Sequence, residues 1–216
     1  MTHFLFEMAW KSCCIAAAGL IVANVLRTLA PAIRANVLRA TLALLFASPF
    51  ISAFGPAVLI EIGSPSPSSV GAGAEQTDSN WLWIAYLSGM AGALAPLAAG
   101  VWSLRRWTSL AHSLNEESWR AAAQRMTSAS AIGARVRVLA SNRISSPLSW
   151  GWRRPTILVD RASLSRPAEA DGILAHEFAH LIRRDWPFLI GSHFVASLFW
   201  FNPLVWMLKH AAERAA

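Results

Sequence analysis

Hydrophobic residues gather in four long runs along the chain, separated by polar connections. The runs cover residues 4–26, 40–60, 81–104 and 186–208. A helix of about twenty apolar residues is long enough to cross the hydrocarbon core of a membrane. The first three runs therefore predict three transmembrane helices, with a kink or an early end at Pro49 or Pro56 in the second.

The fourth run has two interpretations, because Phe201-Asn202-Pro203 interrupts it. It is either a fourth transmembrane helix or a re-entrant hairpin that turns at Asn202-Pro203. His193 lies in this run, where an ionisable side chain is a candidate for function. We expect it instead to be a neutral imidazole bonded to a neighbouring helix.

The region between the third and fourth runs is polar and predicts a small α+β domain. A helix is expected over residues 116–128, after a sequence that resembles a capping box and begins at Ser113. Alternating residues predict strands at 135–139 and 156–159, which we expect to form a small antiparallel sheet. An edge strand there could hold an extended peptide, or the strands could be purely structural. Ser165 and Pro167 mark the expected start of the next helix.

Composition supports a membrane protein of mainly α class. Hydrophobic residues make up 55% of the 216 residues and charged residues only 14%. This is too apolar for an ordinary soluble domain. The sequence therefore predicts three transmembrane helices in 1–104, a polar α+β domain in 105–185, and an apolar hairpin or fourth span in 186–216.

The distribution of the basic residues predicts the orientation of the chain in the membrane and does not indicate nucleic-acid binding. The formal net charge is +7, but the basic side chains are spread over connections and form no nucleic-acid motif, so we expect no direct nucleic-acid binding. Arginines follow the first and third runs, whereas the connection after the second run carries only acidic residues. The positive-inside rule then places the amino terminus outside and residues 105–185 in the cytoplasm.

One motif in the chain carries chemistry, His176-Glu177-Phe178-Ala179-His180. Two histidines four residues apart lie on one face of a helix and can bind one zinc ion. Zinc lowers the pKa of a bound water, and Glu177 is placed to accept its proton and later to protonate the leaving amine.

On a helix, the two histidines lie on a different face from the residues expected to enter the core. Leu174, Phe178, Leu181 and Ile182 form one apolar stripe, and both histidines project from nearly the opposite side. Histidines that only filled a core would lie on the stripe.

These residues resemble a known family, the BlaR/MecR-type membrane zinc metallopeptidases. The resemblance rests on the segment around His176, on Arg183-Arg184-Asp185, on Phe201-Asn202-Pro203-Leu204-Val205-Trp206, and on a lead-in from Ser146-Pro147 to Ile157-Leu158. It implies that His176 and His180 bind Zn2+ and that Glu177 is catalytic. It also implies proteolytic signalling that relieves a transcriptional repressor, although no sensor domain for a beta-lactam is expected here.

The resemblance implies a third zinc ligand, a glutamate on the helix after the Asn-Pro-Leu-Val-Trp motif. Glu213 is the carboxylate near that place, one turn short of it, so it is either the ligand or an ordinary solvated residue in a truncated copy. A straight helix would hold Glu213 and His180 roughly 50 Å apart, whereas a hairpin allows a shared metal ion, so we favour the hairpin. Asp185 could orient a ligating histidine, but an ion pair with Arg183 or Arg184 is the simpler expectation.

The sequence thus predicts an integral membrane zinc endopeptidase that cleaves a protein or peptide substrate at the cytoplasmic face. The alternative is a non-catalytic membrane scaffold or signal-transducing module with an incomplete zinc site. Another membrane metallopeptidase family with the same motif would differ in the position of its third ligand.

Overall fold

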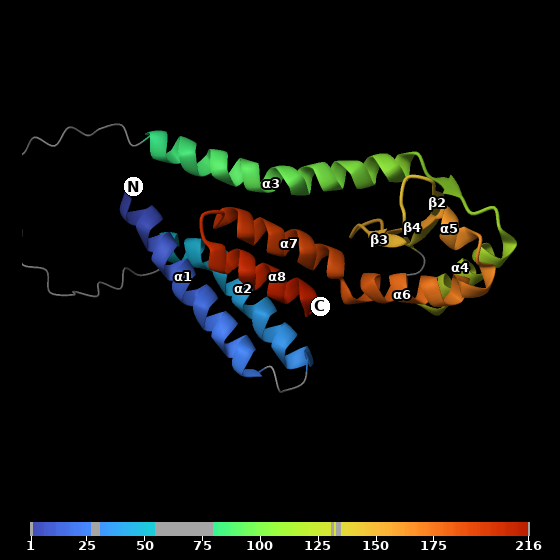
Figure 1. Ribbon diagram of the computed structural model, residues 1–216, viewed down its shortest axis with the longest axis horizontal. Coiled ribbons are helices and arrows are strands. Elements are labelled where there is room, and N and C mark those ends of the chain that lie inside the picture. The colour runs from blue at the N-terminus through green and yellow to red at the C-terminus, as the bar shows by residue number, and fades with distance from the viewer. Residues whose placement is uncertain (1, 27–30, 55–79, 131, 133–134, 216) are drawn as a thin grey trace, which may run out of the picture. The chain divides into compact units, whose positions relative to one another are not determined.

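A computed structural model describes the chain except for residues 1, 27–30, 55–79, 131, 133–134 and 216. The chain forms two compact units (Figure 1). The helical unit comprises residues 1–94 and 193–216, and the α/β unit comprises residues 95–192. Two helices, α3 (Asn80–Ser109) and α7 (Asp185–Leu198), begin in one unit and end in the other.

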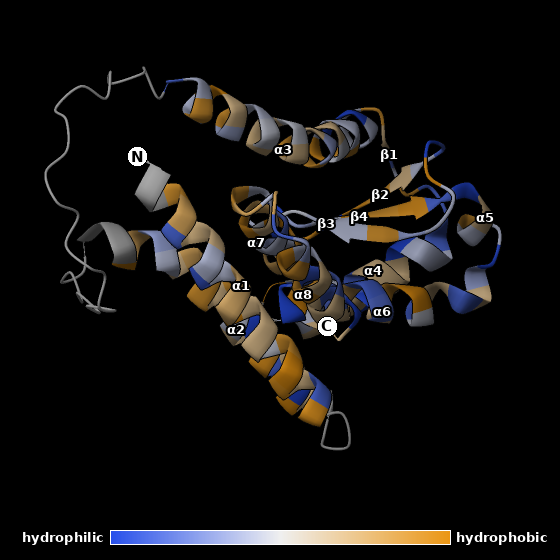
Figure 2. Cartoon of the chain, turned by 60° about the vertical axis from the view of Figure 1, so that its left-hand side comes forward, coloured by the Kyte–Doolittle hydropathy of each residue, from blue (hydrophilic) through white to orange (hydrophobic). Residues whose placement is uncertain are grey.

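The helical unit is built on α1 (Thr2–Val25), α2 (Pro31–Phe54) and α8 (Pro203–Arg214), which pack against one another. Hydrophobic residues dominate α1 along its length (Figure 2). The backbones of α1 and α2 come close at Gly19, where an added Cβ would collide with the side chain of Thr41. Small residues permit this kind of close approach between apolar helices.

Two described helices are long and apolar enough to cross a membrane, Leu5–Val25 and Asn80–Ser109. They correspond to the first and third predicted spans. The second predicted span overlaps α2, which starts earlier and includes Arg34 and Arg39, while the end of that predicted span lies outside the described residues. Length and composition therefore support two of the three predicted spans.

The fourth apolar run is broken into two helices, because α7 ends at Leu198 and α8 begins at Pro203. The Asn202 side chain caps α8 by accepting a hydrogen bond from the Leu204 N–H at 3.0 Å. The rings of His193 and Trp206 are 5.7 Å apart, whereas a straight helix would separate these residues by roughly 20 Å. The chain therefore turns back between them, which excludes one continuous helix over this run.

The α/β unit contains a four-stranded sheet in the order β1-β2-β4-β3. The strands are β1 (His112–Ser113), β2 (Arg137–Ser141), β3 (Leu148–Trp150) and β4 (Thr156–Asp160). The expectation of an antiparallel sheet is wrong for the central pair, because β2 and β4 are parallel. The residues between the two predicted strands also contain β3, which the sequence did not predict and which pairs antiparallel with β4.

Helices α4 (Glu117–Ala129) and α6 (Ala170–Arg183) match the helices predicted for this region. The short helix α5 (Arg161–Leu164) and a 3-10 turn (Pro167–Glu169) lead into α6. The predicted capping box does not form, because Ser113 lies in β1 opposite Leu139. The N-cap of α4 is Glu116, without a side-chain bond to the helix.

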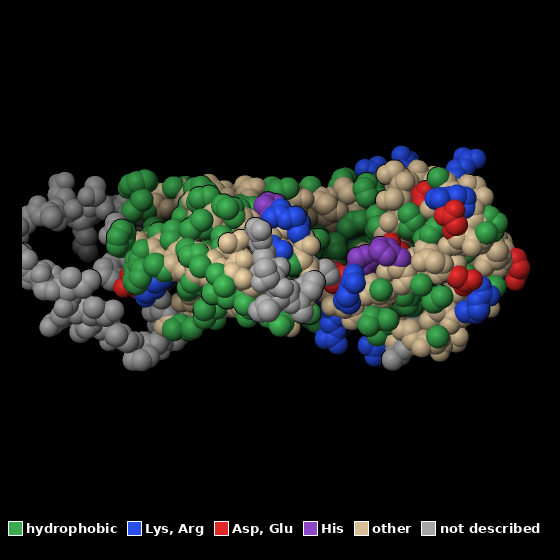
Figure 3. Space-filling view, turned by 60° about the horizontal axis from the view of Figure 1, so that its bottom comes forward, with side chains coloured by type: hydrophobic (Ala, Val, Ile, Leu, Met, Phe, Trp, Pro, Cys, Tyr) green, Lys and Arg blue, Asp and Glu red, His purple; other side chains and the backbone are tan. Residues whose placement is uncertain are grey.

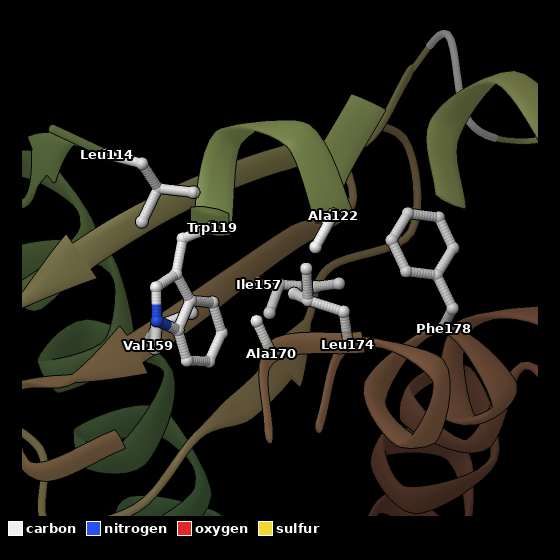
Figure 4. Packing of buried hydrophobic residues seen from close by; sticks show 8 residues of the cluster. All are labelled: Leu114, Trp119, Ala122, Ile157, Val159, Ala170, Leu174 and Phe178. Atoms are coloured by element: carbon white, nitrogen blue, oxygen red, sulfur yellow. The ribbon is translucent and has the colours of Figure 1, made fainter. Parts of the chain in front are cut away.

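One hydrophobic core joins the sheet to α4 and α6 (Figure 4). The largest side chain in it is Trp119 of α4, which is fully buried. From α6, Leu174 and Phe178 enter the core, where β4 contributes Ile157 and Val159. An exposed bidentate ion pair between Arg125 and Asp171 also links α4 to α6. These contacts fix which face of α6 points outward.

Candidate metal centre

Helix α6 holds the two histidines on the face opposite its core contacts. Leu174 and Phe178 are buried, whereas His176 is exposed and the His180 side chain is 36% exposed. Figure 3 shows histidine side chains at the surface of the molecule beside acidic ones. The buried apolar stripe of α6 is shorter than predicted, because Ile182 is 59% exposed.

The geometry of the histidine pair suits one metal ion. The Nε2 atoms of His176 and His180 are 3.2 Å apart. Two imidazole nitrogens bound to one tetrahedral zinc ion at 2.0–2.1 Å would be about 3.3 Å apart. The side chains therefore converge to within about 0.1 Å of this spacing. They fit zinc as two of its ligands.

Asp185 holds the ring of His180 from the other side. The Asp185 Oδ2 atom lies 2.7 Å from His180 Nδ1. An ionised carboxylate only accepts hydrogen bonds, so Nδ1 carries the proton and the Nε2 lone pair is left to face His176. A carboxylate in this position is the usual partner of a metal-binding histidine.

Arg183 shares the same carboxylate oxygen. Its Nη2 atom donates to Asp185 Oδ2 at 3.0 Å. The sequence offered an ion pair and a histidine contact as alternatives for Asp185, and the structure contains both. The exposed Arg183 side chain adds little stability by itself, but it helps to hold the Asp185 carboxylate in place.

The contact between His180 and Asp185 depends on Arg184, the residue that ends α6. Arg184 has a φ of 59°, in the left-handed region, and its N–H bonds to the carbonyl oxygens of His180 and Leu181. A left-handed residue at this position turns the chain sharply out of the helix. The turn brings Asp185 back beside His180.

Glu177 lies next to the histidines but on the side toward the core. The residue is 7% exposed. Within the described part of the chain, no hydrogen bond or ion pair holds its carboxylate. The carboxylate is therefore available to a ligand bound beside the histidines.

The strand β3 forms the edge of the sheet nearest α6. Two contacts of Trp150, at its end, hold it in place. The indole N–H donates to Thr108 Oγ1 at 2.9 Å, and the ring packs edge-on against Trp186 at 5.8 Å. Since Trp186 directly follows Asp185, the edge strand and the carboxylate that orients His180 are held together.

A pocket of about 170 Å³ lies beside His180. Its wall includes Trp152, Trp186, Arg135 and Arg184. Among the described residues, neither arginine side chain has a hydrogen bond or an ion pair. The pocket is large enough for one amino-acid side chain and is lined by positive charge.

The remaining predicted ligand, Glu213, lies on α8 in the helical unit. Its carboxylate pairs with Lys209 at 3.0 Å and lies 3.6 Å from His210 Nδ1. Over residues 2–26, 31–54, 80–130, 132 and 135–215, no group of three His, Cys, Asp or Glu side chains could hold a metal ion. The role of Glu213 as third ligand therefore stays a prediction.

Sequence reasoning missed Trp150 and Arg184 at this site. Leu148-Ser149-Trp150 is too short to give a strand pattern, so no strand was predicted there. Arg184 gives no signal, because left-handed helix ends usually carry glycine or asparagine. His193 is as expected, with its Nε2 atom 3.3 Å from the carbonyl oxygen of Ala93 on α3.

The comparisons with known proteins agree with the motifs. The BlaR1 peptidase M56 family matches residues 8–216. The regulatory protein BlaR1 of Bacillus licheniformis is 35% identical over 74 residues, which are 32% of this chain and only 12% of that relative. The predicted resemblance is thereby confirmed. The chain belongs to the BlaR1 peptidase M56 family, whose members are membrane proteins and zinc peptidases.

Proposed function

We propose that this protein is an integral membrane zinc endopeptidase that cleaves a protein substrate at the cytoplasmic face of a bacterial inner membrane, in regulatory signalling. One observation carries the proposal: two imidazole Nε2 atoms lie 3.2 Å apart while Asp185 holds the far nitrogen of His180. The converging nitrogen atoms support metal binding. At an exposed surface, the same contacts are not needed to hold the fold together. Family membership supports the zinc and the peptidase chemistry.

His176 and His180 would hold the zinc ion, and Asp185 would fix the tautomer of His180. When bound, zinc would polarise the scissile carbonyl group and lower the pKa of a water molecule. Glu177 would take a proton from that water as it attacks and deliver it to the leaving nitrogen.

The edge strand β3 is suited to bind the substrate. Its outer edge can accept an extended peptide through main-chain hydrogen bonds, in the mode known as β-augmentation. Because β3 lies beside α6, a peptide paired with it would pass close to the histidines. Trp150 and Trp186 would keep this edge in place when the peptide binds.

The pocket beside His180 suggests which side chains are preferred. Arg135 and Arg184 supply two guanidinium groups, and the indoles of Trp152 and Trp186 cover the alkyl part of a bound side chain. A carboxylate is the group that two guanidiniums bind best. We therefore expect cleavage beside Glu or Asp, with a higher KM for peptides that carry Gln instead and for an Arg135→Gln variant.

Glu213 is one candidate for the third ligand, and Glu213→Gln tests it. If Glu213 binds zinc, this variant loses most of the metal of the purified protein. If its task is to neutralise Lys209, which is only 6% exposed, zinc content is unchanged and stability falls. The non-catalytic scaffold remains the second candidate function, favoured by the two-ligand site of the described residues.

Metal content and proteolysis together test the proposal. The full chain in detergent is expected to hold close to one zinc ion and to cleave a fluorescein-labelled casein probe. His176→Ala should lose both properties, whereas Glu177→Gln should keep zinc and lose cleavage by about 100-fold or more. His112→Ala, at an exposed histidine outside the site, is the matched control. A metal-free wild-type protein that remains folded would support the scaffold instead.

A further inference from the structure

The helical unit contains a second pocket, which the zinc site does not explain. Its volume is about 330 Å³, and its walls come from α1, α2 and α8. The polar part of its lining includes Arg34, His210 and Arg214, and the apolar part includes Leu20, Met207 and Ala211. A pocket with cationic groups on one side and an apolar wall on the other suits an amphipathic anion.

Arg34 is the most informative residue in this pocket. Its Nε atom is buried, and no described residue accepts a hydrogen bond from its guanidinium group. The residue as a whole is partly exposed, but a buried N–H donor normally has a hydrogen-bond partner. An anion in the adjoining pocket would supply the missing acceptor.

The other charges around the pocket leave it positive. Arg214 is exposed and has no ion pair among the described residues. Glu213 is the nearby acid, and Lys209 neutralises it at 3.0 Å. The guanidinium groups of Arg34 and Arg214 therefore have no acidic partner among the described residues. His210, 3.6 Å from Glu213, adds a further donor.

The surroundings of the pocket point to a lipid. Large apolar side chains on two of the helices that form the pocket are exposed, among them Ile21, Val22 and Val25 on α1 and Met207 on α8. The pocket also lies toward the end of a candidate membrane span, Leu5–Val25, and that end leads into the connection whose arginines predict a cytoplasmic location. Basic pockets between membrane helices at that side are suited to acidic lipid headgroups.

We propose that this pocket binds the phosphate group of an anionic phospholipid. Arg34 donates to the phosphate oxygens from the depth of the pocket, and Arg214 donates from the rim. The acyl chains lie along the exposed apolar side chains of α1. A free phosphate ion shares the headgroup chemistry but cannot use these apolar contacts.

Native mass spectrometry of the full chain released from detergent tests this proposal. Phosphatidylglycerol and phosphatidylcholine with identical acyl chains are titrated separately, and inorganic phosphate is titrated alone and as a competitor. We expect the wild-type protein to retain one phosphatidylglycerol in preference to phosphatidylcholine. Arg34→Gln and Arg214→Gln should each weaken that binding about tenfold.

The controls distinguish binding in this pocket from a general attraction between the positively charged protein and an anionic lipid. Arg105→Gln removes the same charge at an exposed position outside the pocket and should leave phosphatidylglycerol binding unchanged. If Arg34→Gln does not fold, Arg34→Lys and the exposed Arg214→Gln carry the test. Equal retention of the two lipids, equal effects of all three glutamine variants, or displacement by inorganic phosphate at the lipid's own concentration would each overturn the proposal.

Discussion

The two units of this protein differ in the large apolar side chains that they leave exposed. In the α/β unit, large apolar residues such as Trp119 and Phe178 are inside. In the helical unit, Phe6 and Ile21 of α1 are 71% and 63% exposed, although other apolar residues such as Phe199 are buried. Water drives apolar groups inward, and lipid exerts no such force. The exposed apolar side chains of α1 therefore favour a lipid surrounding for this helix.

The largest expected effect concerns the core of the α/β unit. Trp119→Ala should lower the free energy of unfolding of this unit by about 3–5 kcal/mol, because a fully buried indole leaves a large cavity. Near-UV circular dichroism during urea titration in detergent measures the change. Trp119→Phe, which removes an unpaired N–H and less volume, should cost within about 1.5 kcal/mol. Equal losses for Ala and Phe would show that packing does not stabilise this unit.

The second prediction concerns polar contacts in the helical unit. Asn202 caps α8 and its Nδ2 donates to Ser12 Oγ on α1 at 2.9 Å. Asn202→Ala should destabilise the helical unit by about 2–3 kcal/mol, as the sum of a lost N-cap and a lost buried hydrogen bond. Thermal unfolding in detergent measures it. Ser12→Ala removes only the second contact and should cost about 1 kcal/mol. Full additivity in the double variant would contradict a direct bond.

The third prediction separates metal binding from stability in the α/β unit. Asp185→Ala should weaken zinc binding by about 10–100-fold, because His180 loses the partner that fixes its tautomer. Competition with a chromophoric chelator measures this affinity. Asp171→Ala, at an exposed acid of the same helix, is the control and should leave the affinity unchanged. If the two variants behave alike, Asp185 is only a surface ion-pair partner.

The smallest expected effect concerns the end of α6. Arg184→Gly should be more stable than Arg184→Ala by about 1 kcal/mol, because only glycine adopts the left-handed conformation without steric cost. Both variants lose the same side chain, so their difference reports the backbone alone. Urea titration of the pair gives the value. A more stable alanine variant would mean that Arg184 is not left-handed in solution.

Local patterns in the sequence predicted most of the long helices, although α2 begins before the apolar run that predicted it. The spacing of His176 and His180 predicted a shared face, and the structure brings their Nε2 atoms together. Pro167 and the polar residues around it predicted where the motif helix begins. These features depend on residues within one or two turns of each other, which is the range over which sequence patterns act.

Features that depend on distant residues could not be predicted. The parallel pairing of β2 and β4 depends on where β3 places the chain, and no short pattern encodes it. The bond between Asn202 and Ser12 joins residues 190 positions apart. The stripe on α6 was extended to Ile182 because hydrophobicity alone does not show where the core ends.

Helix α7 begins at the residue that holds His180. Its first residue is Asp185, and the ring of the following Trp186 packs against Trp150 at the edge of the sheet. The ends of a helix fray more readily than its interior. Loss of the first turn of α7 would therefore move the carboxylate away from the imidazole, and the packing of Trp186 opposes that loss.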